Sequence, residues 1–280
     1  MGTEKRERQK ANRDARLAAE QAAAARQRRI RFIRNAVILT IVIIAVGFAL
    51  SGCGSSDSSD GSAAADQTST TVAGATSDKA TYGTGACPPA EGATKPVITF
   101  TAAPKQCIDP AKTYTAEVKT TEGSFSLQFD TERTPVTTNN FVVLARYRYF
   151  DGTSFFRTEA QSGIIQGGSP HTQDNTDPGP GYMIPDEGLP FTAADYAPGT
   201  IAMARTATPD SAGGQFFLLA NEGGAYLGDP DSLGSSAGSY AVFGKVTEGA
   251  DVLAKIAALD DGASAPTKDV KIQTVTISES

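Results

Sequence analysis

The 280-residue sequence has no tryptophan, a single histidine (His171), and three cysteines that form no CxxC pair. One histidine leaves little room for Ser-His-Asp or Cys-His catalysis, and no phosphate-binding glycine loop occurs. His171 also has no cysteine near it in the sequence, which argues against a zinc site. We therefore expect a protein that needs no nucleophile, metal or cofactor, and we assign no role to His171.

Basic residues are concentrated at the N-terminus. Residues 1–34 hold 11 Lys/Arg and 4 Asp/Glu, whereas the rest of the chain holds 14 basic and 27 acidic residues. An acidic remainder argues against nucleic acid as the main partner, and a basic leader suits the surface of an anionic membrane.

A long apolar run follows the basic leader. From Ala36 to Leu50 the chain reads AVILTIVIIAVGFAL, and with its flanks the run approaches the roughly 20 residues that cross a bilayer. Arginines crowd its N-terminal side, and no Lys or Arg follows until Lys79. This asymmetry predicts a cytoplasmic leader at residues 1–32, a single transmembrane anchor at residues 33–53, and a cell-membrane protein with the remaining chain outside.

The end of the apolar run allows a second interpretation. Leu50-Ser51-Gly52-Cys53 resembles a bacterial lipobox, in which the leader is cleaved and the cysteine receives lipid. The basic region is longer than in most cleaved signals, which favours an uncleaved anchor. Both alternatives, an anchor at residues 33–53 and lipidation of Cys53, attach the same domain to the same face of the membrane.

Residues 54–86 contain almost no large apolar side chain, so we predict a disordered linker rich in Ser, Asp and Thr. The composition changes at Cys87, where we place the start of a folded domain that extends to residue 280. Two nearby cysteines outside the cytoplasm usually pair, so we predict a disulfide between Cys87 and Cys107. The alternative is two free thiols.

Short strands dominate the predicted domain. Tyr114 to Lys119 and Ser124 to Phe129 flank a glycine-containing turn and predict a hairpin. Pro135 to Tyr147 and Gly249 to Leu259 have helical patterns, the first with proline in its first turn. Further strands are predicted at Ser154 to Phe156, Ile164 to Gln166, Gly199 to Ala204, Gln215 to Ala220, Ala241 to Val246 and Val270 to Ile277. Many short strands with only two helices indicate a mainly β fold, a closed β-barrel with helical plugs.

Several short motifs occur in a fixed order, and any one of them alone is weak. They are Asn139-Asn140-Phe141, Tyr149-Phe150-Asp151-Gly152, Ser154-Phe155-Phe156-Arg157, Gln166-Gly167-Gly168, Gly179-Pro180-Gly181-Tyr182, Gly199 to Ala204, Gly214-Gln215-Phe216-Phe217 and Val242 to Val246. In this order and at these spacings, the stretch from Tyr114 to Ile277 resembles a cyclophilin. The resemblance implies a closed eight-stranded barrel capped by two helices, with an external groove that binds Xaa-Pro segments.

The resemblance also implies roles for individual residues. The catalytic arginine of the family falls on Arg157. It would stabilise the twisted transition state of an Xaa-Pro bond through a hydrogen bond, and no covalent intermediate forms. Residues of the proline pocket and the peptide groove fall on Ile164, Gln166, Ala204, Arg205, Gln215, Phe217, Tyr226, Leu227 and Tyr240. By the same comparison, Phe216 belongs to the core and Phe217 to the pocket.

The sequence departs from the family pattern around this site. Phe156 stands where the family usually has histidine, Arg205 where it has asparagine, and Tyr226 where many members have tryptophan. The segment Thr158 to Ile165 is longer than usual, and residues 228–239 are an insertion at the pocket rim. We keep Phe156 among the substrate-binding residues.

These features give two functional hypotheses. The first is a monomeric, membrane-tethered peptidyl-prolyl isomerase that acts on proline-containing, unfolded or extended polypeptides outside the cytoplasm. The second is a cyclophilin-like module that binds such segments with little or no turnover. The retained Arg157, Gln166, Gln215 and Phe217 favour the enzyme, and the altered Phe156 region keeps the binding module open.

Overall fold

The computed structural model describes residues 81–280. The predicted leader, the anchor with Cys53, and nearly all of the linker at residues 54–86 lie outside this range. Among residues 81–280, no helix has the length and apolar character needed to cross a membrane.

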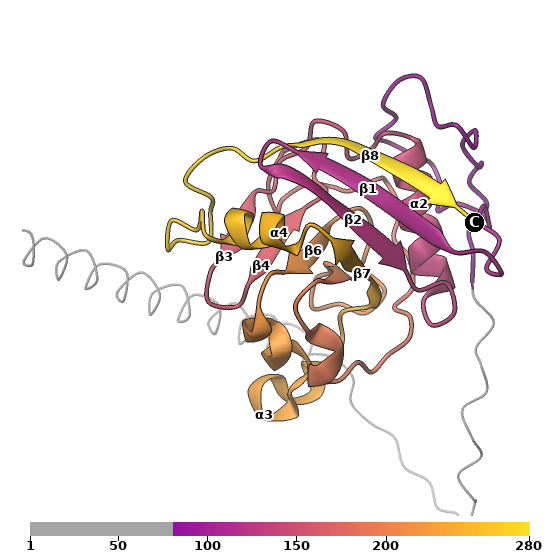
Figure 1. Cartoon of the computed structure of the whole chain (residues 1–280). Coiled ribbons are helices and arrows are strands. Elements are labelled where there is room, and N and C mark those ends of the chain that lie inside the picture. The colour runs from indigo at the N-terminus through magenta and orange to yellow at the C-terminus, as the bar shows by residue number, and fades with distance from the viewer. Residues whose placement is uncertain (1–80) are drawn as a thin grey trace, which may run out of the picture. The chain divides into compact units, whose positions relative to one another are not determined.

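A single curled sheet of eight strands forms the body of the domain (Figure 1). Its order is β3-β4-β6-β5-β7-β2-β1-β8. The strands are β1 Tyr114–Thr120, β2 Gly123–Phe129, β3 Arg157–Glu159, β4 Ile164–Gly167, β5 Thr200–Met203, β6 Phe216–Leu219, β7 Val242–Glu248 and β8 Ile272–Glu279. The helices are α2 Pro135–Arg146, the short α3 Pro230–Leu233 and α4 Ala250–Ala257. Turns of 3₁₀ helix cover Ala193–Tyr196, Glu222–Gly228 and Gly234–Ser236.

The hairpin and both long helices lie close to where the sequence predicts them. Along β1 and β2 buried and exposed side chains alternate, as expected for strands with one face on a core. Gly123 ends the turn between them with φ +134°, a backbone conformation that residues other than glycine rarely adopt. Pro135 occupies the first turn of α2, where no intrahelical N–H bond is lost.

The expectation of a closed barrel is wrong. The sheet has two edges, β3 and β8, and an isolated bridge between Ser154 and Lys271 joins the chain just ahead of these two strands. The N–H of Phe155 donates to the carbonyl of Val270 at 2.8 Å beside that bridge. β3 pairs with β4 along all three of its residues, but it forms no ladder with β8. The predicted strand at Ser154 to Phe156 is likewise reduced to the single bridge.

Two hydrophobic clusters lie on the two faces of the sheet. The larger one fills the inside and includes Phe216, Phe141 of α2 and Ile256 of α4. The smaller one contains Ile164, Ala202, Phe217 and Leu227. Because successive residues of a strand point to opposite faces, Phe216 and Phe217 divide between the two clusters. The second cluster therefore lies on the outer face.

Residues 81–113, which we call the lead-in segment, run beside α2. The N–H of Gly83 donates to the carbonyl of Pro104 at 2.9 Å, so contacts with the domain are already present before the predicted boundary at residue 87. Cys87 and Cys107 form the predicted disulfide, with their Cα atoms 5.4 Å apart. The bond closes the lead-in segment into a loop at the edge of the domain.

Candidate active site

Three polar side chains form a line across neighbouring strands. Arg157 on β3 faces Gln166 on β4 in the sheet register, and Gln215 precedes β6. Nη1 of Arg157 donates to Oε1 of Gln166 at 2.9 Å, and Nε2 of Gln166 donates to Oε1 of Gln215 at 2.9 Å. The sequence predicts all three residues in one site, and the structure brings them together.

Glu159 holds the other side of Arg157, and no role for it was predicted from the sequence. One carboxylate oxygen accepts from Nε of Arg157 at 3.1 Å and also from Nη2. Burial acts to raise the pKa of Glu159, but hydrogen bonds from Arg157 and Ser162 outweigh it and hold the pKa below its ordinary value. The signal in the sequence was its spacing, since a residue two positions from Arg157 lies on the same face of a strand.

An apolar wall lies next to this polar line. Phe217 pairs with Gln166 across β4 and β6 and with Ala202 across β5 and β6. Ile164, Phe217 and Leu227 are each only 4% exposed. The ring of Tyr240 meets Phe217 edge-on, with centroids 5.6 Å apart. The structure thus gathers the predicted proline-pocket residues in one outer cluster.

A cavity of about 390 Å³ adjoins the polar line. We call it the groove. Its lining includes Arg157, Gln166, Ala204, Arg205 and Gln215, all predicted from the sequence, together with Asn175, Asp177, Pro178, Gly179, Pro180, Tyr182, Met183, Thr206, Ser211, Gly213 and Gly214. Among these, residues 177–182 form one wall of the groove. From the sequence, Gly179 to Tyr182 were identified only as a motif, without a role in the site. Phe156 is half-buried and lies outside this lining.

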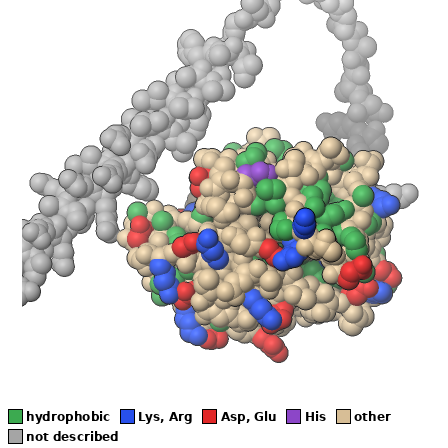
Figure 2. All heavy atoms as spheres, turned by 90° about the horizontal axis from the view of Figure 1, so that it is seen from above, with side chains coloured by type: hydrophobic (Ala, Val, Ile, Leu, Met, Phe, Trp, Pro, Cys, Tyr) green, Lys and Arg blue, Asp and Glu red, His purple; other side chains and the backbone are tan. Residues whose placement is uncertain are grey.

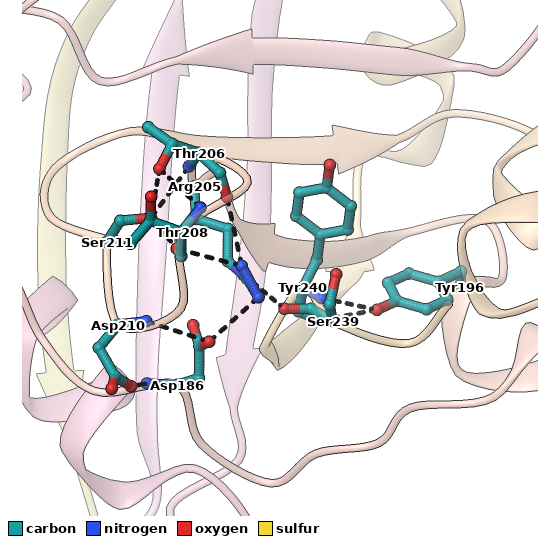
Figure 3. Close-up of polar contacts among 9 residues, drawn as sticks. All are labelled: Asp186, Tyr196, Arg205, Thr206, Thr208, Asp210, Ser211, Ser239 and Tyr240. Carbon is teal, nitrogen blue, oxygen red and sulfur yellow. Dashed lines mark hydrogen bonds and ion pairs between the residues drawn. The ribbon is translucent and has the colours of Figure 1, made fainter. Parts of the chain in front are cut away.

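The Arg205 side chain is held by protein groups from three loops (Figure 3). Its Nε donates to the carbonyl of Ser239 at 2.9 Å, and Nη2 lies 3.2 Å from Oδ2 of Asp186. Nη1 donates to the carbonyls of Thr206 and Thr208 at 3.2 and 3.3 Å. The two charged side chains of this ion pair are 9% and 10% exposed. The guanidinium therefore braces the groove rim.

The backbone of Tyr240 is fixed next to this brace. The hydroxyl of Tyr196 donates to the carbonyl of Tyr240 at 2.8 Å, and the N–H of Tyr240 lies 3.2 Å from the same hydroxyl oxygen. Figure 3 shows Tyr240 following Ser239 directly, so Arg205 and Tyr196 hold consecutive residues. Tyr226 lies near Arg157, and burial, followed by the charge of Glu159, raises its pKa.

The insertion at residues 228–239 packs beside the apolar wall. It contains α3 and the 3₁₀ turn Gly234–Ser236, and Leu233 packs against the outer cluster. The N–H of Gly238 donates to the carbonyl of Leu227 at 2.8 Å, and the N–H of Phe191 donates to the carbonyl of Gly238 at 3.0 Å. The insertion is therefore docked on the domain through backbone bonds on both sides.

The domain carries no grouped metal ligands in its described part. Among residues 81–280, no cluster of three or more His, Cys, Asp or Glu side chains has an arrangement that would hold a metal ion. What the site offers chemically is an arginine with fixed orientation, two amide side chains and a dry aromatic wall.

Comparison with known proteins agrees with this geometry. The family described as cyclophilin type peptidyl-prolyl cis-trans isomerase/CLD matches residues 115–277, more than half of the chain. The peptidyl-prolyl cis-trans isomerase cyp18 of Streptomyces antibioticus is 36% identical over 165 residues, which cover 58% of this chain and 95% of the relative. The peptidyl-prolyl cis-trans isomerase B of Escherichia coli K12 is 33% identical over 172 residues, covering 57% and 97%.

A solved cyclophilin-type isomerase of Cryptosporidium parvum also resembles the chain. It has a TM-score of 0.49 and 23% identity, and the comparison covers 59% of this chain and 98% of the other. The lead-in segment up to residue 113 precedes the matched region. On the family match and the two bacterial relatives, the chain belongs to the cyclophilin-type peptidyl-prolyl cis-trans isomerases.

Proposed function

We propose that the chain is a membrane-tethered enzyme that catalyses cis–trans isomerisation of Xaa-Pro bonds in polypeptides outside the cytoplasm, with Arg157 as the catalytic residue. The observation that carries the catalytic part is the orientation of Arg157 between Glu159 and Gln166, beside the wall formed by Phe217 and Leu227.

The reaction needs a group that binds only the twisted bond. At a 90° twist the amide loses its resonance, which sets a barrier of roughly 18–20 kcal/mol. The proline nitrogen then becomes pyramidal and regains a lone pair that the planar ground state does not offer. A hydrogen bond from a guanidinium to that lone pair stabilises the transition state selectively.

Arg157 retains donors for this bond. A guanidinium has five N–H groups. Within residues 81–280, three of these groups donate to Glu159 and Gln166, so two N–H groups remain for a substrate. The two partners fix the plane of the guanidinium before the substrate arrives, which removes the entropy loss of ordering it in the transition state. No proton transfer is needed.

The apolar wall would hold the proline ring while the other side of the bond rotates. Ile164, Phe217 and Leu227 supply dry surface next to Arg157, and exclusion of water strengthens the hydrogen bond to the proline nitrogen. Ala204 and Gln215 line the adjoining groove, where the peptide backbone on either side of the proline would lie.

Cis–trans exchange spectroscopy on short Xaa-Pro peptides tests the catalytic role. The wild type should accelerate exchange, and Arg157→Ala should reduce kcat/KM about 100-fold, the scale for removing one transition-state donor. Lys119→Ala, at an exposed position of β1, is the matched control and should leave the rate unchanged. Equal rates for the wild type and Arg157→Ala would refute the assignment.

A second candidate is a module that binds proline-containing segments with little turnover. The observation in its favour is the covered state of Phe217, which is 4% exposed and contacts Tyr240. Peptide binding by the wild type without any acceleration of exchange would support this candidate.

The location is supported by the sequence, through the arginine cluster before the apolar run and the cysteine pair after it. External protease added to intact cells should remove the domain if it lies outside. The intact mass of the membrane-extracted protein then distinguishes an anchor at residues 33–53 from a chain that begins at a lipidated Cys53.

A further inference from the structure

The lead-in segment contacts the wall of the groove although it precedes the family match at residues 115–277. The N–H of Phe100 donates to the carbonyl of Pro180 at 2.8 Å. At Gly181 the two backbones approach so closely that a Cβ atom would lie 2.5 Å from the carbonyl oxygen of Phe100. Pro180 lines the groove, so this backbone bond reaches the site from behind.

Tyr182 is the side chain shared by the groove and the lead-in segment. It lines the groove on one side and, on the other, a second cavity of about 260 Å³ between the lead-in segment and α2. The ring of Phe100 packs against Tyr182 and against Tyr147, which follows α2, with centroid distances of 6.1 and 5.1 Å. Phe100 therefore supports the back of the tyrosine whose front faces the groove.

The hydroxyl of Tyr182 extends this support to the groove floor. It donates to Oδ1 of Asn140 at 2.7 Å, and Nδ2 of Asn140 donates to the carbonyl of Gly213 at 2.8 Å. Gly213 lines the groove two residues before Gln215. A continuous series of contacts thus runs from Phe100 through Tyr182 and Asn140 to Gly213, in the segment that leads through Gln215 into β6.

His171 makes a second connection between the lead-in segment and the wall. Its Nε2 lies 3.1 Å from the hydroxyl of Thr99, and its Nδ1 lies 3.2 Å from Oδ1 of Asp177. Because Nδ1 faces a carboxylate, we assign the ring proton to Nδ1, so that Nε2 accepts from Thr99. Figure 2 shows this face of the domain, where hydrophobic side chains gather near the one histidine.

Asp177 is a firm anchor for this connection. Its side chain is fully buried and accepts hydrogen bonds from the backbone N–H groups of His171, Thr172 and Gly179 at 2.7 to 2.9 Å. Asp177 is a lining residue of the groove, and its buried carboxylate holds the turn that leads into the wall. His171 ties this turn to Thr99, which lies 72 residues earlier in the chain.

We propose that the lead-in segment contributes to substrate binding at the isomerase site, with Phe100 and His171 as positioning residues that hold the 177–182 wall. The wall would contact substrate residues flanking the proline, while Arg157 and Phe217 act on the proline itself. This inference rests on the proposed function. It predicts that the lead-in segment affects the affinity for extended substrates and leaves the chemical step unchanged.

The test uses two peptides and the full-length chain in detergent. One peptide is a blocked Ala-Pro dipeptide, and the other carries three further residues on each side of the same dipeptide. The variants are Phe100→Ala and Thr99→Val, with Thr99→Ser as the variant that restores the hydroxyl. Thr101→Val is the matched control, since the Thr101 side chain is exposed and makes no hydrogen bond to residues 81–280.

For Phe100→Ala and Thr99→Val, KM and Kd for the long peptide should rise about fivefold, the scale of one lost hydrogen bond or comparable contact. KM and Kd for the dipeptide, and kcat for both peptides, should stay at the wild-type level. Thr99→Ser should recover the affinity for the long peptide, and Thr101→Val should not change it.

Equal losses for both peptides, or no loss for either, would overturn the inference. A variant that is partly unfolded lowers kcat for both peptides alike, which separates damage from a change in the wall. If the wild type binds peptides without accelerating exchange, the proposed function fails, but the Kd comparison between the two peptides still decides the role of the lead-in segment.

Discussion

Glu159 accepts two hydrogen bonds from Arg157 through a single carboxylate oxygen, and both residues lie on β3. The same oxygen also lies 3.3 Å from the hydroxyl of Ser264, and the other oxygen accepts from Ser162 at 2.8 Å. The carboxylate is thus held from both sides and in turn holds the guanidinium. Its charge should therefore affect the catalytic step through Arg157.

Glu159→Gln should lower kcat about tenfold with little change in KM, because it weakens a charge-assisted hydrogen bond that orients Arg157. Exchange spectroscopy on one Xaa-Pro peptide measures both constants. Glu222→Gln, which alters an exposed glutamate of the same fold, is the control. An unchanged kcat in Glu159→Gln would show that Gln166 alone orients Arg157.

The pH profile gives a second test of the same pair. The pKa of Glu159 is lowered on folding, so its charge persists below the ordinary glutamate value of about 4.3. The stabilisation that it provides is present above the unfolded pKa and is lost as the pH falls through the folded pKa. We expect kcat to stay level down to about pH 4.3 and to fall only below it, and Glu159→Gln should lack this acid limb.

The brace around Arg205 should show strong coupling to Asp186. Arg205→Ala leaves a nearly buried carboxylate without its ion-pair partner and should reduce the free energy of unfolding by about 3–5 kcal/mol. Urea unfolding of Arg205→Ala, Asp186→Ala and the double variant measures the coupling. We expect the double variant to lose less than the sum of the two single variants.

An exposed ion pair provides the comparison for this cycle. Lys255 and Asp251 on α4 are 59% and 70% exposed, so the same cycle on this pair should give a much smaller coupling. Additive losses at Arg205 and Asp186 would instead show that the carbonyls of Thr206, Thr208 and Ser239 hold the guanidinium by themselves.

Much of the fold could be predicted because the signals are local. The β1–β2 hairpin depends on period-two alternation and on Gly123, and α2 depends on Pro135 and its apolar face, all within a few residues. The division of Phe216 and Phe217 between two clusters follows from the same alternation together with the family pattern.

The interactions that could not be predicted from the sequence join positions far apart in the chain. Thr99 and His171 are 72 residues apart, and Arg205 reaches Ser239 across 34 residues. No periodicity encodes such pairs, because the loops that carry them are placed by the sheet. The open edge between β3 and β8 was missed for a related reason. Resemblance gives the number of strands, but whether β3 and β8 pair depends on how residues far apart in the chain, in the loops before them, are placed.

Removal of the Cys87–Cys107 disulfide should loosen the lead-in segment. The bond closes a loop with a sequence separation of 20, for which the loop-entropy relation gives about 3 kcal/mol. Hydrogen exchange of a Cys87→Ser, Cys107→Ser double variant should show faster exchange at the N–H of Gly85, which donates to Ala103, and at the N–H of Lys105, which donates to Gly85. The N–H groups of β1 and β2 serve as the internal control and should keep their protection.

Glu187 should make the stability of the domain depend on pH in the opposite sense to Glu159. It accepts hydrogen bonds from the N–H groups of Val136 and Thr137, at the start of α2, at 3.0 and 2.9 Å. Burial raises the pKa of Glu187 and outweighs these hydrogen bonds, which lower it. The folded state therefore binds more protons than the unfolded state between the ordinary glutamate pKa and the raised one.

The sign of the expected effect follows from this proton balance. The stability that Glu187 contributes is complete below the unfolded pKa of about 4.3 and declines as the pH rises through the folded pKa, with a slope of at most about 1.4 kcal/mol per pH unit. Urea unfolding between pH 4 and 7 should show this decline in the wild type relative to Glu187→Gln, which has no titrating group there. The exposed Glu91→Gln variant should run parallel to the wild type. If the wild type instead gains stability relative to Glu187→Gln as the pH rises, the hydrogen bonds from α2 outweigh burial.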